Sequence, residues 1–228
     1  MAMRLPFRFR TISVLALPAL FLALGSLAFA GPITTNLTLT GAGPANDGQY
    51  DIYPYTAQVN GQSYTVVCLD SYDNVTVGES WPVDVLNLGD VLNGSDLTDT
   101  RFGNPSAPHY DSNAVTDYEE AAWLETQFGS DTTTNVQIQH AIWDLFNPGF
   151  SSDTGNWLSA AANAATSGFG SLDFANFTLF SPTGPTGQEF LTPVSTPEPA
   201  TWAMLAAGLM MLLAGAGWRR RRAAAIAA

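Results

Sequence analysis

The sequence predicts an α+β fold: an antiparallel, β-rich domain of the sandwich or barrel-like kind, with two or three inserted helices and one C-terminal transmembrane helix. Two alternating runs flank an Asn60-Gly61 pair, which is the strongest short-range signal of a β-hairpin. After residue 115 the apolar period becomes helical. Residues 200–218 contain no charge and are long enough to cross a bilayer. Strands followed by helices and then by strands indicate an α+β arrangement.

The predicted strands are short runs rich in Thr, Val, Tyr and Leu. In the second half of the hairpin, Tyr64, Val66 and Cys68 share one face because side chains alternate along a strand. The predicted strands are residues 33–40, 53–59 and 62–69, two weaker candidates at 75–83 and 85–92, and two closing strands at 174–180 and 188–194.

Three helices are expected between these groups of strands. Thr116 and Glu119 form a capping box that predicts a helix over 116–128. Thr134 and Gln137 form a second box, which predicts a helix over 134–146. An Ala-rich run predicts a third helix over 157–165.

The N-terminus is typical of a secretory signal peptide. Arginines 4, 8 and 10 precede an apolar run, and Ala28 and Ala30 provide the small residues at which signal peptidase cuts, before Gly31. The alternative is an uncleaved anchor. The predicted organisation is a signal peptide at 1–30, an exported domain at 31–180, a Pro/Gly-rich tether at 181–199, a transmembrane helix at 200–218 and an Arg-rich cytoplasmic tail at 219–228.

Charge is distributed unevenly along the chain. Between residues 31 and 199 there are 20 acidic residues and one arginine, Arg101, so this stretch carries 1 − 20 = −19, and the chain contains no lysine. Phosphate binding needs Lys and Arg, so nucleic acid is excluded as a partner.

The C-terminus resembles the PEP-CTERM sorting signal of bacteria. Pro197, Glu198 and Pro199 precede the apolar span, and Arg219, Arg220, Arg221 and Arg222 stop transfer after it. Thr196 stands where Val is usual. The resemblance implies recognition by exosortase, an inner-membrane stage before processing, and then a place on the cell surface or outside the cell. It also implies an association with exopolysaccharide and biofilm.

Motifs for enzymes or resident metals are scarce. The sequence has no G-x-S-x-G elbow, H-E-x-x-H pair or C-x-x-C pair. We therefore expect no enzyme, no catalytic residues and no metal site, and we interpret His109 and His140 as structural. Calcium is the one cofactor considered, because Asp70, Asp73 and Asn74 are oxygen ligands close together in the sequence.

Cys68 and Gln139 together resemble the thioester domains of bacterial surface adhesins. In these domains an early cysteine is followed by a Thr-Gln-x-Ala motif; here Ile138 replaces the Thr, and Gln139 and Ala141 match. The resemblance implies an internal thioester between Cys68 and Gln139, formed autocatalytically with loss of ammonia and open to capture by surface amines or alcohols. The absence of lysine fits such a reactive group.

Several interpretations stay open from the sequence. The first is a structural or adhesive surface component that binds without covalent chemistry, in which Cys68 is an ordinary buried hydrophobic residue. The second is a covalent adhesin that uses the thioester. A calcium- or glycan-binding module is a further alternative, and hydrolysis of matrix glycans would need two facing carboxylates.

Overall fold

The computed structural model describes residues 32–151, 154–193 and 208. The chain divides into two units, Met1–Gly31 and Pro32–Ala228, and the folded domain belongs to the second. The expected signal peptide, with Ala28 and Ala30, therefore lies outside the described residues.

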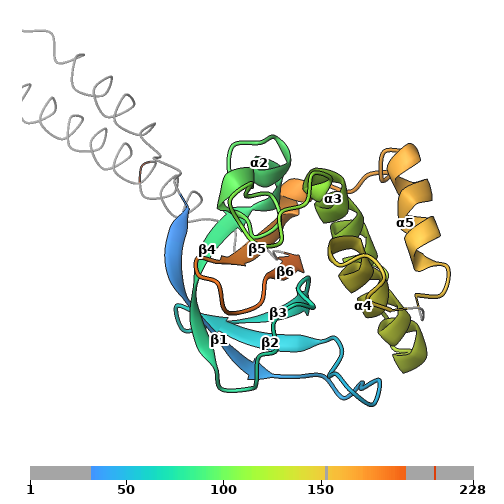
Figure 1. Cartoon of the computed structure of the whole chain (residues 1–228), viewed down its shortest axis with the longest axis horizontal. Helices are drawn as coiled ribbons and strands as arrows, with labels where there is room; N and C mark the ends of the chain where they lie inside the picture. Colours follow the sequence, from blue (N-terminus) through green and yellow to red (C-terminus); the bar gives the residue numbers. More distant parts are fainter. Residues whose placement is uncertain (1–31, 152–153, 194–207, 209–228) are drawn as a thin grey trace, which may run out of the picture. The chain divides into compact units, whose positions relative to one another are not determined.

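Six antiparallel strands form a closed barrel in the order β1-β2-β3-β6-β5-β4, and β4 pairs back onto β1 (Figure 1). This confirms the antiparallel, barrel-like expectation. Closure leaves no unpaired sheet edge. The strands are β1 (Ile33–Gly41), β2 (Tyr55–Val59), β3 (Gln62–Cys68), β4 (Ser80–Asn87), β5 (Phe177–Pro182) and β6 (Phe190–Pro193).

The hairpin between β2 and β3 forms as predicted. Asn60 and Gly61 have φ angles of 51° and 77°, which a tight two-residue turn requires. The two weaker strand candidates, 75–83 and 85–92, are wrong as a pair, since a single strand, β4, overlaps both ranges. Its chain turns into a short helix, α2 (Leu88–Leu92), because the Asn87 side chain accepts a hydrogen bond from the Gly89 N–H at 2.9 Å and caps the helix.

The three longer helices also form, although both predicted capping boxes are wrong. Helix α3 (Ala114–Glu125) begins before Thr116, and Asn113 precedes it without a side-chain cap. Helix α4 (Thr132–Phe146) is capped by Asp131, whose carboxylate accepts from the Thr134 N–H at 2.8 Å. Helix α5 (Trp157–Thr166) follows, and two single 3₁₀ turns, η1 (Leu97–Asp99) and η2 (Phe174–Asn176), complete the described elements.

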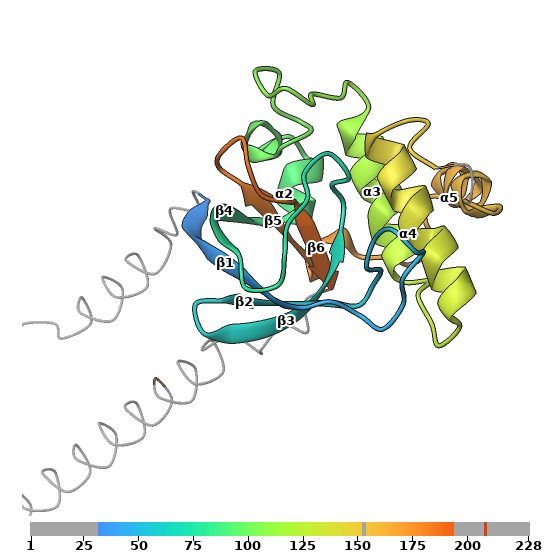
Figure 2. The ribbon, with the colours of Figure 1, turned by 60° about the horizontal axis from the view of Figure 1, so that its bottom comes forward.

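Two hydrophobic clusters hold the domain together. One fills the barrel, and the other lies between the barrel wall and the helices. Figures 1 and 2 show α3 and α4 beside the barrel, with α5 on their outer side. Alternation along β3 divides its residues: Val66 and Cys68 belong to the barrel cluster, and Val67 belongs to the cluster under the helices. Trp143 of α4 belongs to the barrel cluster, so this helix contributes to the barrel core.

Strand β6 lies inside the range expected to be a tether, 181–199. It pairs with β3 and β5, so the folded domain continues through Pro193 rather than stopping at residue 180. Among the described residues, no helix has the length and apolar character that a membrane span needs. Residues 200–218, where the transmembrane helix is expected, lie outside the described part of the chain except for Gly208.

Candidate functional site

Cys68 is the last residue of β3, and its side chain points into the barrel cluster. It is 1% exposed, and its thiol donates a hydrogen bond to the Asp70 carbonyl oxygen at 3.1 Å. The predicted shared face with Val66 is confirmed, since both side chains are in the barrel cluster and Tyr64 packs against it. The cysteine is therefore enclosed.

Gln139 lies on α4, is fully buried, and meets Cys68 directly. Its side-chain nitrogen donates to the Cys68 carbonyl oxygen at 2.7 Å. A carbonyl oxygen can only accept, so the atom that faces it must be the amide nitrogen rather than the amide oxygen. The Gln139 Oε1 atom is buried and has no hydrogen-bond partner among the described residues. The structure thus brings the two predicted residues together and leaves the carboxamide oxygen unsatisfied.

Trp143 lies one helical turn after Gln139 and faces the same pair. Its indole N–H is buried and makes no hydrogen bond within the described part of the chain, although it is placed to stabilise a thiolate on Cys68. Tyr50 and Phe150 contact the Trp143 ring edge-on, at centroid distances of 5.6 and 5.2 Å. Water is therefore kept away from the site by aromatic side chains.

Burial controls the protonation of the thiol. Loss of solvation raises the pKa of Cys68 far above its usual range, and the nearby Asp70 carboxylate raises it further. The Trp143 indole and the Arg101 guanidinium act in the opposite direction but do not reverse the shift. At neutral pH the sulfur carries its proton, so any reaction with Gln139 must move that proton as the new bond forms.

A second buried polar cluster lies next to Cys68 and is built around Arg101. The guanidinium Nε is 2.8 Å from Asp70 Oδ2, and one terminal nitrogen is 2.8 Å from Asp73 Oδ2. The other terminal nitrogen donates to the Gly187 carbonyl oxygen at 2.8 Å. Burial raises the pKa of Asp70 to about 6, and the Arg101 charge partly opposes this. The sequence analysis missed this cluster, although Arg101 is the one cation between residues 31 and 199.

The Arg101 cluster occupies carboxylates that were considered for calcium. Asp70 and Asp73 both face the guanidinium, and Asn74 lies apart on the wall of a pocket. Within the described ranges, no group of three or more acidic, His or Cys side chains is arranged to hold a metal. Calcium binding therefore stays a prediction from the sequence, and the geometry of these residues gives it no support.

Glu189 extends the same cluster into the core. It is fully buried. Its carboxylate accepts one hydrogen bond from the Tyr118 hydroxyl at 2.8 Å and another from the main-chain N–H of Arg101 at 3.1 Å. Burial raises the pKa of Glu189 to about 7, despite these hydrogen bonds. No sequence motif marks Glu189, which lies in the range expected to be a tether.

The two histidines have structural surroundings. His140 Nε2 is 2.8 Å from Asp47 Oδ2, and its Nδ1 is 3.0 Å from the Ser151 hydroxyl, so it ties two loops to α4. His109 stacks on Tyr72 at a centroid distance of 3.7 Å. Burial lowers the pKa of His109, and the Arg101 charge lowers it further.

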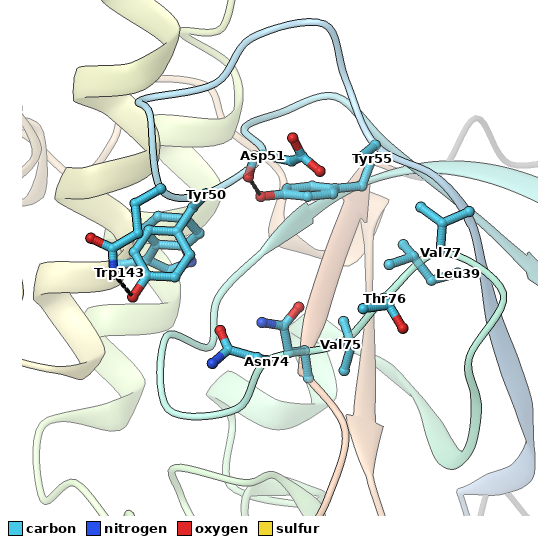
Figure 3. A pocket seen from close by; sticks show the side chains of 12 residues that line it. Leu39, Tyr50, Asp51, Tyr55, Asn74, Val75, Thr76, Val77 and Trp143 are labelled. Atoms are coloured by element: carbon cyan, nitrogen blue, oxygen red, sulfur yellow. Dashed lines mark hydrogen bonds between the residues drawn. The ribbon is translucent and has the colours of Figure 1, made fainter.

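A pocket of about 460 Å³ opens beside Trp143 and Tyr55. Figure 3 shows Asp51 and Tyr55 on one side, Asn74, Val75 and Thr76 opposite them, and Tyr50 in front of Trp143 at one end. Tyr55 and Trp143 also belong to the same cluster of buried residues as Cys68. The pocket therefore shares two lining residues with the cluster that contains Cys68, although neither Cys68 nor Gln139 lines it.

Comparison with known proteins gives one match. Residues 195–222 match the family model of the PEP-CTERM protein-sorting motif, and they include Pro197, Glu198, Pro199 and all four C-terminal arginines. Except for Gly208, these residues lie outside the described part of the chain. No curated protein and no solved structure matches the chain. The motif implies an exosortase substrate that is anchored in the membrane and then exported as a surface or extracellular protein.

Proposed function

We propose that this exported protein is an adhesive component of the cell surface or extracellular matrix, and that it attaches to its partner covalently through a thioester between Cys68 and Gln139. The observation that carries the proposal is the hydrogen bond from the buried Gln139 carboxamide to the main-chain carbonyl of Cys68, which places the carboxamide at this residue while its own oxygen has no partner among the described residues. Buried polar atoms normally have partners, and exceptions call for an explanation such as chemistry at the site.

Formation of the thioester needs no other reactant. The Cys68 sulfur bonds to the side-chain carbonyl carbon of Gln139, the bond from that carbon to nitrogen breaks, and the thiol proton leaves with the nitrogen as ammonia. The amide nitrogen that leaves is the atom that donates to the main-chain carbonyl oxygen of Cys68. Negative charge develops on Oε1 during the reaction, and the unpaired Trp143 N–H on the same helix face is a candidate donor to it.

Capture of a partner then regenerates the thiol. An amine or hydroxyl adds to the thioester carbonyl, the carbon–sulfur bond breaks, and the partner becomes joined to the Gln139 side chain. Until that step, the aromatic cover from Tyr50, Phe150 and Trp143 protects the thioester from hydrolysis. Because the chain has no lysine, none of its own side-chain amines competes for the acyl group.

The test is the intact mass of the mature protein. Wild type should be lighter by one ammonia, and methylamine should add its own mass to that lighter form, giving an N-methylated Gln139 amide and a free Cys68 thiol. Cys68→Ala and Gln139→Glu should show neither effect, whereas Gln58→Glu, at an exposed amide on β2, should behave as wild type. A full mass in wild type, with one thiol titrated after unfolding, would refute the thioester and leave a surface protein that binds without covalent chemistry.

Sorting gives a separate prediction. In a host with exosortase, the mature protein should lack residues 200–228, because the enzyme is expected to cut near Pro197-Glu198-Pro199. Deletion of the exosortase should leave a longer protein in the inner membrane. Mass spectrometry of envelope and medium fractions measures both forms. Equal retention of the tail in the two strains would mean that the segment serves only as an anchor.

A further inference from the structure

The pocket beside Trp143 is a built cavity with walls from separate parts of the chain. Tyr50 and Asp51 come from the loop before β2, Tyr55 begins β2, Asn74 lies in the loop after β3, and Trp143 comes from α4. Its volume of about 460 Å³ is within the range of small-molecule sites. In Figure 3 the Tyr55 ring is seen edge-on along one side of the cavity, and the residue is only 6% exposed.

The lining combines aromatic surface with neutral hydrogen-bonding groups. Tyr50 is half-buried and stands at one end in front of Trp143, and Tyr55 closes one side of the cavity. The Asn74 amide makes no side-chain hydrogen bond to any described residue and is exposed, so its donors and acceptor are available to a ligand. Gln188 lines the pocket as well; its amide nitrogen is used by two backbone carbonyls, which fixes the side chain in place.

Charge narrows the class of ligand. No cation lines the pocket, and Arg101 is held by Asp70 and Asp73, so an anionic ligand would find no partner. The one charged side chain in the lining is Asp51, which is exposed and already accepts from the Asn46 amide at 2.9 Å. An exposed carboxylate adds little to the binding of a cation. A neutral ligand with both apolar faces and hydroxyl groups matches this lining best.

We propose that this pocket binds a neutral saccharide unit. A sugar ring presents C–H groups on its faces, which pack on an aromatic ring such as the half-buried Tyr50, and hydroxyls at its edge, which bond with amides and carboxylates such as Asn74 and Asp51. This binding is non-covalent and does not depend on the thioester. A glycan in the pocket would nevertheless lie beside Trp143 and Tyr55, next to the proposed covalent site.

The experiment is a screen of the mature protein on an array of neutral, acidic and amine-bearing oligosaccharides, followed by calorimetry with the best neutral ligand. Cys68→Ala protein is screened in parallel, and it should bind as wild type does. Glycan binding should not change when the thioester is lost, so the saccharide proposal and the thioester proposal can be refuted independently.

Variants then locate the ligand. Asp51→Ala combined with Asn74→Ala removes two hydrogen-bonding groups and should weaken binding about tenfold. Thr76→Trp places a large ring at an exposed position on the pocket wall and should abolish binding. Asp90→Ala combined with Asn163→Ala, at exposed positions away from the pocket, is the matched control and should have no effect. Equal binding by all variants, a preference for acidic or amine-bearing glycans, or no binding on the array would overturn the proposal.

Discussion

Two buried polar clusters meet at the end of β3, and they differ in how their polar atoms are satisfied. Around Arg101 the charges are paired: the guanidinium faces Asp70 and Asp73, although its Nε and Asp70 Oδ2 meet as an ion pair without a well-formed hydrogen bond. Around Gln139, a carboxamide oxygen and an indole N–H are buried without partners among the described residues. A cluster of paired charges fixes the position of chain segments, whereas buried neutral groups with neither a hydrogen bond nor an ion pair indicate a group that reacts or binds. We therefore assign structure to the first cluster and chemistry to the second.

Removing Arg101 should have the largest effect on stability. Arg101→Met leaves the Asp70 carboxylate buried without its cation, and the free energy of unfolding should fall by about 3–5 kcal/mol. Urea unfolding at pH 8 measures this loss. Asp73→Ala is the control: this side chain is 31% exposed, and its removal should cost less than about 1 kcal/mol.

Adding Asp70→Asn to Arg101→Met should restore part of the stability, since no unpaired charge is then buried. If Arg101→Met costs no more than Asp73→Ala, the Arg101 cluster is not structural, and the contrast between the two clusters fails.

Stability should also depend on pH through four buried carboxyls, of which only Asp70 faces a cation within the described part of the chain. Burial is the main cause that raises the pKa of Asp117, Glu125 and Glu189 to about 7 and of Asp70 to about 6. A carboxyl with a raised pKa binds its proton more tightly in the folded state, so its contribution is complete below the unfolded pKa and is lost as pH rises. The domain should therefore be more stable at pH 5 than at pH 8.

Glu189→Gln should flatten that dependence, because the amide cannot ionise. Asp99→Asn, at an exposed carboxyl, is the matched control and should keep the wild-type slope. The measurement is the urea midpoint at several pH values between 5 and 8. Stability that rises toward pH 8 would contradict the assignment of unpaired buried carboxyls.

Altering the unsatisfied cluster should have the smallest effect on stability. Gln139→Leu removes one hydrogen bond to the main-chain carbonyl of Cys68 and also one buried oxygen without a partner. Because these two changes have opposite effects on stability, the free energy of unfolding should change by less than about 1 kcal/mol. The same variant should lose all capacity to release ammonia. A loss as large as that of Arg101→Met would mean that Gln139 serves the fold, and that the two clusters have the same role.

Much of the barrel could be predicted from local signals. The turn at Asn60-Gly61 and the alternation along β3 depend on neighbouring residues, and both were predicted correctly. The end of β4 and the start of α2 depend on the cap that the Asn87 side chain provides. The apolar residues of 85–92 also favour a strand, so the sequence alone does not show that a helix begins there. The positions of the α3 and α4 termini were missed because several Thr, Asn and Asp residues offer rival caps at each one.

The candidate site was predictable only where chemistry marks a residue. Cys68 stands out as the single cysteine, and Gln139 stands out through the resemblance to thioester domains. Glu189 and Asp47 carry no such mark: their roles come from contacts with Tyr118 and His140, which are far away in the sequence. Pairings of this kind depend on barrel closure and helix docking, and no local pattern encodes them.

The position of β6 has a mechanical consequence. This strand ends at Pro193, and residues 194–196 separate it from the Pro197-Glu198-Pro199 motif. It pairs with β3 at Val67 and Cys68. A pull on the C-terminus therefore loads β6 first and then passes to the strand that carries Cys68. For a partner held at the Cys68–Gln139 pair, tension between the partner and the C-terminus runs through one short strand pairing and bypasses most of the barrel.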